Sequence, residues 1–179
     1  MVYVLLADGF EEIEALGFID ILRRGEIEVK SVSVNGDITV SGSHNISVNA
    51  DCTLNDIDLN CLDAVVLPGG MPGTLNLLNN QKVIDIINYS VKNDKYLGAI
   101  CAAPMILGKL GILNGKVATC YPGFENELSG AVLSDAPVCK DGKIITSRGA
   151  GTVHNFAHCF VSALKNEEIA DKIISSMQY

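Results

Sequence analysis

The chain has 179 residues, the length of one ordinary domain with a substantial core. Hydrophobic residues make up 48% of it and charged residues 19%, which excludes a disordered chain. Its formal net charge of -8, with no basic cluster larger than Arg23-Arg24, argues against a nucleic-acid partner. No apolar stretch is long enough to span a bilayer, and the apolar start lacks the basic region of a signal peptide. We therefore expect a cytoplasmic protein with no membrane partner.

Strand and helix patterns alternate along the chain, which predicts an α/β fold with a mainly parallel sheet. The first half predicts strands over 2–7, 29–34 and 64–67, a helix over Glu12–Arg24, and an edge hairpin over 37–48. The second half predicts a helix over 81–93, strands over 96–100 and 116–119, a hairpin over 138–146, and helices near 152–164 and 167–177. No linker or repeat interrupts this pattern, so we expect a single domain over residues 1–179.

A cysteine ends the apolar strand pattern over 96–100. The residues after it predict a helix, with Pro104 tolerated in the first turn. Cys101 thus falls on a strand-to-helix turn, the position of a nucleophile elbow, with the small neighbours that such a turn needs. At a helix N-terminus we expect a lowered thiol pKa, which favours the thiolate. The alternative is a buried structural cysteine, since free cysteine is among the most buried residues.

Three carboxylates occupy the start of the helix over Glu12–Arg24. Glu11 and Glu12 are explained by the helix dipole. Glu14 differs, because at roughly 100° per residue it lies between Phe18 and Ile21, at the margin of the apolar face. A carboxyl against apolar side chains resists ionisation and can act as a general acid or base near neutral pH.

The glycine pair Gly69-Gly70 follows the strand over 64–67. Parallel strands collect ligands at their carboxyl ends, where Cys101 is also expected. The backbone N–H groups of Gly70 and Ala102 are candidates for an oxyanion hole beside the sulfur, and a plain tight turn is the alternative. The chain contains no phosphate-binding glycine motif.

The remaining cysteines and histidines give no sign of a metal or cofactor. The six cysteines form no C-x-x-C pair, and we expect reduced thiols. His154 and His158 are four residues apart but lack the glutamate of a zinc-binding helix, so we expect no metal site and no cofactor. His44 falls in a predicted edge loop, where we expect a solvated side chain.

Four motifs together resemble the ThiJ/PfpI family, and within it the DJ-one-like branch of the parkinsonism-associated protein deglycase. They are Asp8-Gly-Phe-Glu-Glu-Ile-Glu14, Val65-Val-Leu-Pro-Gly-Gly70, Ala99-Ile-Cys-Ala-Ala-Pro104 and Thr146-Ser-Arg-Gly-Ala-Gly-Thr152. The resemblance implies a flavodoxin-like three-layer sandwich with helices on both faces of the sheet. It also implies a homodimer that uses the helix over Glu12–Arg24, where Gly17 would permit close approach.

The same resemblance implies roles for individual residues. Cys101 matches the reactive, easily oxidised cysteine, Glu14 the protonated glutamate that hydrogen-bonds it, and the Gly70 and Ala102 backbones the oxyanion-hole donors. Several family members carry a histidine near the cysteine in the loop after the following strand, where this chain has Tyr121. Tyr121 is a candidate substrate contact. Its neighbour Cys120 is a candidate resolving thiol, with a plain core or surface position as the alternative.

Three hypotheses for function follow. The first is a cysteine-dependent enzyme of carbonyl-stress defence, with glutathione-independent glyoxalase or deglycase chemistry on methylglyoxal or its glycated adducts through Cys101 and Glu14. The second is a redox-sensing or chaperone-like protein whose Cys101 is oxidised to the sulfinate. A cysteine peptidase or amidase ranks last, because no histidine has an evident route to Cys101.

Overall fold

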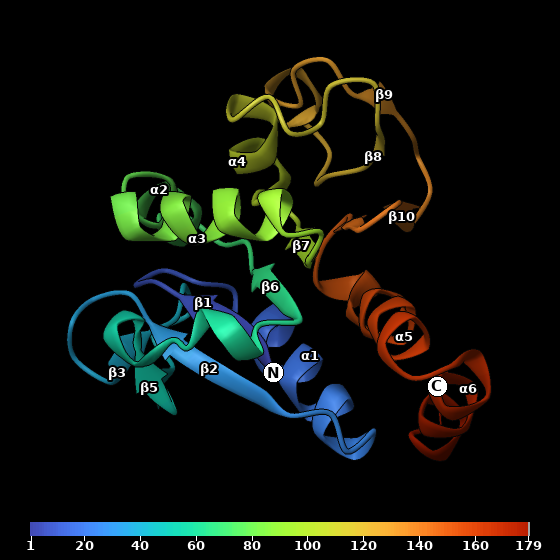
Figure 1. Cartoon of the computed structure of the whole chain (residues 1–179), viewed down its shortest axis with the longest axis horizontal. Helices are drawn as coiled ribbons and strands as arrows, with labels where there is room; N and C mark the ends of the chain where they lie inside the picture. Colours follow the sequence, from blue (N-terminus) through green and yellow to red (C-terminus); the bar gives the residue numbers. More distant parts are fainter. Residues whose placement is uncertain (179) are drawn as a thin grey trace.

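A seven-stranded sheet forms the centre of the computed structural model, which describes residues 1–178 (Figure 1). Its strand order is β10-β11-β7-β6-β1-β2-β5, and the β10–β11 pair alone is antiparallel. The strands are β1 (Val2–Leu6), β2 (Val29–Ser33), β5 (Cys52–Thr53), β6 (Ala64–Leu67), β7 (Tyr96–Ile100), β10 (Val138–Asp141) and β11 (Ile144–Ser147).

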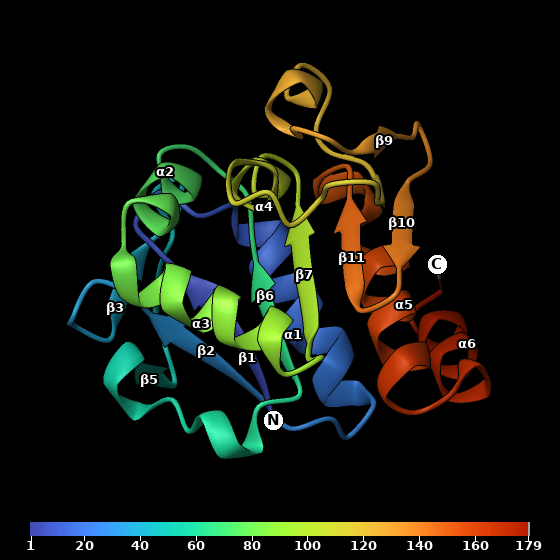
Figure 2. The same ribbon diagram turned by 45° about the horizontal axis from the view of Figure 1, so that its top comes forward.

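Helices cover both faces of this sheet (Figure 2). One layer contains α1 (Glu12–Arg24), α5 (Val153–Leu164) and α6 (Glu167–Ser176), and the other contains α2 (Gly73–Leu78), α3 (Gln81–Lys92) and α4 (Pro104–Lys109). Short 3-10 turns occur at Leu54–Asp56, Leu59–Cys61, Glu125–Glu127 and Ala150–Thr152. This is the flavodoxin-like three-layer sandwich that the sequence predicts. Among residues 1–178, no helix combines the length and apolar character that crossing a membrane requires.

The buried strand β1 shows how the sequence forms both cores at once. Val2, Val4 and Leu6 pack into the core under α1 and α5, while the alternate residues Tyr3 and Leu5 pack into the core under α3 and α4. Successive side chains of a strand point to opposite faces, so a strand between two helical layers must be apolar throughout.

Two predicted elements are correct in kind but wrong in place. The hairpin expected over 37–48 forms as β3 (Thr39–Ser41) and β4 (Ser47–Asn49), a separate two-stranded sheet, while β5 takes the edge of the central sheet. The strand expected over 116–119 shortens to β8 (Val117–Ala118) and pairs with β9 (Val132–Leu133) outside the central sheet. Helix α2 is an element that the sequence pattern did not indicate. The helices predicted near 81–93, 152–164 and 167–177 are confirmed to within one residue at either end.

The chain order places a topological switch point between β1 and β6. From β1 the chain moves outward to β2 and β5, and then returns to the other side of β1 to form β6, β7 and β11. Open parallel sheets bind ligands at such a point, beyond the carboxyl ends of the strands. The chain there carries Gly9 to Glu14, which runs into the first turn of α1, together with Gly69-Gly70 and Cys101.

Candidate active site

Cys101 occupies a strained backbone position between β7 and α4. Its φ of 65° lies in the left-handed region, which a residue with a side chain adopts only at a cost. Two backbone hydrogen bonds hold it there: its N–H donates to the oxygen of Ser147 at 2.9 Å, and its oxygen accepts the N–H of Tyr121 at 2.8 Å. The strand-to-helix turn predicted at Cys101 is therefore confirmed, although the helix itself begins only at Pro104.

Glu14 lies in the first turn of α1 and is 1% exposed. Its Oε2 accepts the N–H of Gly69 at 2.8 Å, and the N–H of Glu11 donates to the oxygen of Gly69 at 2.9 Å. These two bonds join the start of α1 to the loop after β6. The other carboxyl oxygen, Oε1, is buried and has no hydrogen-bond partner among the described residues. A buried carboxyl oxygen without a partner is costly, so it marks a place where a proton or a ligand is expected.

Gly69 brings the carboxyl group and the thiol together. A Cβ atom at Gly69 would lie 2.6 Å from the Cβ of Cys101 and 2.8 Å from Oε2 of Glu14. Real Cβ atoms do not approach other atoms so closely, so residue 69 must lack a side chain for both groups to keep their places. Local sequence gives no sign of this role, because the space that Gly69 leaves is needed by residues 55 and 32 positions away in the chain.

Burial dominates the protonation of both groups. It raises the pKa of Glu14 from 4.5 to about 7, and the Gly69 N–H and the Cys101 thiol only partly oppose it. It also raises the pKa of the Cys101 thiol from 9.0 to about 12, with the negative charge of Glu14 as the second cause. The expected raised pKa of Glu14 is confirmed.

The expectation of a lowered thiol pKa is wrong. Helix α4 has six residues and begins three residues after Cys101, so its dipole is too weak and too far along the chain to outweigh burial. The backbones of Ala102 and Gly70 do lower the thiol pKa, although less than burial raises it. Both groups predicted as oxyanion donors thus lie within reach of the sulfur. Gly70 has a φ of 89°, and a Cβ there would lie 2.4 Å from the oxygen of Gly9.

Tyr121 lies over Gly149 at the open side of the site. It is 50% exposed, and a Cβ at Gly149 would lie 3.3 Å from its ring and 3.8 Å from Oε1 of Glu14. Tyr121 is therefore placed where a ligand beside the carboxyl group could contact it. Cys120 is buried and packs into the core under α4, whereas Cys101 packs against the core under α1. Tyr121, the residue after Cys120, donates its N–H to the oxygen of Cys101 at 2.8 Å, so the two cysteines are close along the backbone although their side chains pack into different cores.

Two histidines contact acidic side chains. His44 is exposed but not simply solvated as expected, because its Nδ1 lies 2.8 Å from Oε2 of Glu12 and its N–H donates to Oε1 of Glu12 at 2.7 Å. These contacts lower the pKa of Glu12 to about 2, against the effect of its burial. Among residues 1–178, Glu11, Glu12 and His44 form the group that could supply metal ligands. Hydrogen bonds within this group already account for its geometry. His158 pairs with Asp171 of α6 at 2.7 Å.

The six cysteines form no disulfide within residues 1–178. A Cβ at Gly17 of α1 would contact Val153 of α5 at 3.6 Å. Asp20 and Arg24 of the same helix form an ion pair at 2.7 Å.

The chain is similar in sequence and in structure to known proteins of one family. The model of the DJ-1/PfpI family matches residues 1–163. The chain belongs to the DJ-1/PfpI family. It is 34% identical to the protein dj-1beta of Drosophila melanogaster over 97% of this chain and 94% of that protein. It is 32% identical to a deglycase of Pyrococcus abyssi over 92% of this chain and 99% of that protein.

Solved structures of this family agree with the fold. The crystal structure of a DJ-1 superfamily protein from Salmonella typhimurium gives a TM-score of 0.95 at 35% identity, and covers 99% of this chain and 97% of that one. Oxidized DJ-1 of Toxoplasma gondii gives a TM-score of 0.95 at 33% identity, with the same coverage. Two Arabidopsis thaliana homologues of DJ-1 are longer, so the chain spans 45% and 40% of their lengths. The family predicted from the four sequence motifs is confirmed.

Proposed function

We propose that this member of the DJ-1/PfpI family is a carbonyl-stress enzyme that converts methylglyoxal, or its glycated adducts, without glutathione. The observation that carries the proposal is the buried Oε1 of Glu14, which has no partner and belongs to a carboxyl group with a pKa of about 7 beside Cys101. Such a group can accept and return a proton near neutral pH. Deglycases of Pyrococcus are among the similar proteins, which supports a substrate with a reactive carbonyl or a glycated group.

The first step forms a carbon–sulfur bond. The Glu14 carboxylate takes the thiol proton as the Cys101 sulfur adds to the aldehyde carbon of methylglyoxal. The carbonyl electron pair moves to oxygen, and the N–H groups of Gly70 and Ala102 stabilise this oxyanion. Glu14 then returns the proton to the oxygen, which gives a neutral hemithioacetal. Passing the proton to Glu14 also removes the negative charge that raises the thiol pKa, so the thiolate forms only when the acid beside it is neutral.

The second step moves hydrogen between the two carbons. The Glu14 carboxylate removes the proton from the former aldehyde carbon, and the electron pair forms an enediolate with the neighbouring carbonyl carbon and its oxygen. The hydroxyl proton on the former aldehyde carbon passes to that neighbouring oxygen, and Glu14 returns its own proton to the neighbouring carbon, which leaves a thioester of lactate on Cys101. Water cleaves the thioester, releases lactate and restores the thiol, so the sum is methylglyoxal plus water to lactate. We assign Tyr121, whose ring lies beside Gly149, the role of a contact to a substrate oxygen.

The test is lactate formation from methylglyoxal without added thiol. We expect Cys101→Ser and Glu14→Gln to lose nearly all turnover, while Cys61→Ser, which removes an exposed thiol elsewhere, keeps it. Near-full lactate production by Cys101→Ser would overturn the proposal. A glycated peptide as the second substrate distinguishes deglycase from glyoxalase activity within the same set of variants.

The second candidate function is redox sensing, in which Cys101 is oxidised to the sulfinate. A protonated Glu14 would donate its hydrogen bond to a sulfinate oxygen, which gives its unpartnered carboxyl oxygen a partner. Intact-mass measurement after mild peroxide tests this function. Two oxygens on Cys101 before the other thiols react support it, and indiscriminate oxidation contradicts it. The peptidase hypothesis ranks last, because a peptidase needs a histidine beside Cys101, and His44 and His158 pair with Glu12 and Asp171 instead.

The proposal includes a homodimer formed through α1. This helix leaves Ile13 58% exposed and Leu16 37% exposed, although the rest of its apolar face is buried. Burial of two such side chains against a second copy would be favourable. Light scattering should give twice the chain mass of 19.0 kDa, and Ile13→Asp should shift it to the single-chain mass. A single-chain mass for the wild type would contradict the dimer.

A further inference from the structure

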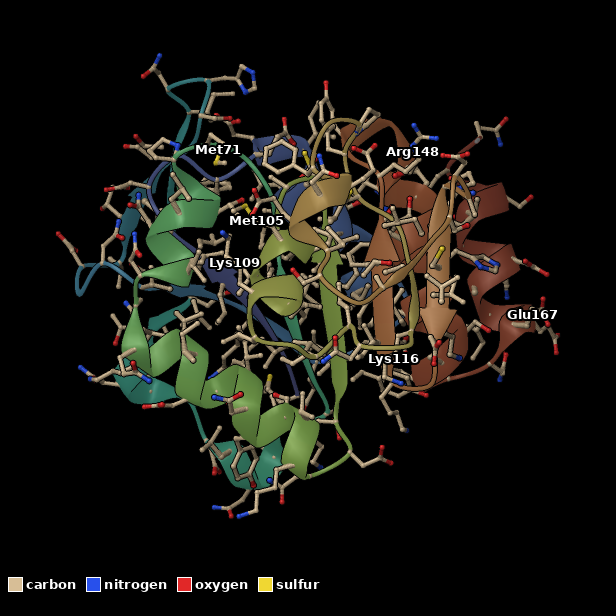
Figure 3. All side chains as sticks on the ribbon, turned by 90° about the horizontal axis from the view of Figure 1, so that it is seen from above. Met71, Met105, Lys109, Lys116, Arg148 and Glu167 are labelled. Carbon is tan, nitrogen blue, oxygen red and sulfur yellow. The ribbon has the colours of Figure 1, made fainter. Side chains whose placement is uncertain are left out.

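A groove of about 470 Å³ lies at the opposite end of β7 from Cys101. It is formed by the end of α3, the start of β7, the start of β8 and the hairpin between β10 and β11. Four lysines line it together with the ring of Tyr96; they are Lys95, Lys116, Lys140 and Lys143. Figure 3 shows Lys116 of the groove well below Arg148, the residue that follows the carboxyl end of β11.

The charge of this groove contrasts with that of the whole chain. The chain has 13 basic residues and a net charge of -8, yet four of the basic residues face one groove. Lys116 is paired with Asp141 at 3.3 Å. No carboxylate of the described residues forms an ion pair with Lys95, Lys140 or Lys143, although Asp94 is also on the lining. The groove therefore carries net positive charge that the protein does not neutralise itself.

Two of these ammonium groups share one aromatic ring. Nζ of Lys143 lies 4.1 Å from the centroid of the Tyr96 ring, and Nζ of Lys140 lies 5.8 Å from it. The ring attracts each cation, but the two cations repel each other. An anion between them would turn this repulsion into two attractions. Because the lysines already cover the ring, a ligand would be recognised by its charge and not by stacking an aromatic base on Tyr96.

We propose that this groove binds a small polyanion, a molecule that carries two or more phosphate or carboxylate groups. Its volume falls within the range of about 300–1,000 Å³ that small-molecule sites occupy. Lysine binds phosphate and carboxylate as a point charge, and several lysines around one groove suit a ligand with several charged groups. The site is separate from the chemistry at Cys101. Gly98, Ala99 and Ile100 of β7 separate Leu97, on the groove lining, from Cys101, and at about 3.3 Å per residue this separation of roughly 13 Å exceeds the reach of a direct contact.

The experiment titrates the full chain with tripolyphosphate and, separately, with citrate, and follows amide shifts by NMR and heat by calorimetry. We expect saturable binding that weakens with added salt, with the largest shifts at Tyr96, Gly142 and Lys143. Binding of tripolyphosphate alone assigns the site to phosphates, and binding of citrate alone assigns it to carboxylates. The absence of saturable binding by either would overturn the proposal.

A matched pair of double variants separates a local site from general charge. Lys140→Gln with Lys143→Gln removes two charges from the groove, and we expect binding about tenfold or more weaker. Lys109→Gln with Lys172→Gln removes the same charge from α4 and α6 and should leave binding within about twofold. Equal weakening by both pairs would also overturn the proposal, because it would show attraction to net charge only. Methylglyoxal turnover should be unchanged in both double variants, so this result does not depend on the proposed enzyme activity.

Discussion

Glu14 and Cys101 are 87 positions apart in the chain, and both lie against Gly69. A Cβ atom on Gly69 would be 2.8 Å from Oε2 of Glu14 and 2.6 Å from the Cβ of Cys101. The Glu14 carboxyl group accepts a hydrogen bond from the Gly69 N–H. The strained backbone of Cys101 donates a hydrogen bond to Ser147 of β11. The carboxyl group cannot move toward bulk water without breaking its hydrogen bond to the Gly69 N–H, and the backbone bonds of Cys101 fix the position from which its sulfur extends. Their shared burial therefore sets the protonation of both.

The first prediction concerns Cys101 reactivity against pH. The Cys101–Glu14 pair loses its first proton near pH 7, and the second only near the raised thiol pKa of about 12. The iodoacetamide rate at Cys101 should therefore rise up to about pH 7 and then level off through pH 9. In Glu14→Gln the rate should keep rising over that range, because the thiol alone titrates. Peptide mass spectrometry gives the rate at this residue, and a wild-type rate that climbs steadily from pH 7 to 9 would refute the coupling.

The second prediction concerns stability. Glu14 has a folded-state pKa above its unfolded value, so its contribution is fully present below pH 4.5 and is lost as the pH rises through about 7. This shift corresponds to a loss on the order of 3 kcal/mol. Glu14→Gln should therefore raise the free energy of unfolding at pH 8 but not at pH 4.

The neighbouring carboxyl group is a control with the opposite sign. The pKa of Glu12 falls to about 2 because His44 donates to it, so its stabilisation is present above pH 4.5 and is lost as the pH falls toward 2. Glu12→Gln should lower the free energy of unfolding at pH 8. Urea denaturation of both variants at both pH values checks the signs, and two variants that shift alike would contradict the assignment.

The third prediction concerns the space at Gly69. Gly69→Ala should abolish turnover and lower the free energy of unfolding by about 1–3 kcal/mol, since its methyl group would overlap Cys101 and Glu14. Gly151→Ala is the matched control, because a Cβ at Gly151 meets no atom within 4 Å. Thermal denaturation and the lactate assay measure both variants. Full activity of Gly69→Ala would contradict the prediction, because it would show that Cys101 and Glu14 do not need the space left by a glycine at residue 69.

The fourth prediction concerns backbone strain at Cys101. At a φ of 65° a residue with a Cβ atom is sterically strained, whereas glycine adopts this conformation without strain. Cys101→Gly should therefore be more stable than Cys101→Ala by about 1 kcal/mol, the reverse of the usual order of these residues. Both variants should be inactive. If Cys101→Ala proved the more stable of the two, the turn would not be strained.

Much of this protein could be predicted from local patterns. Alternating apolar segments indicated the layers, because a strand buried on both faces and a helix buried on one leave different periods in the sequence. The same reasoning placed Cys101 on a turn and Glu14 at the margin of an apolar face, since both positions depend on near neighbours in the chain. Four motifs in order were enough to indicate the family.

Tertiary structure alone decided what depends on distant residues. The pKa of Cys101 is set by burial and by Glu14, so a rule based on its own helix gave the wrong direction. The engagement of Glu12 by His44, the space at Gly69 and the lysine groove join segments that the chain order keeps apart. Local sequence determines the hydrophobic periodicity of strands and helices and the positions of turns. The burial of a side chain and the charges around it depend on which distant segments the fold brings together.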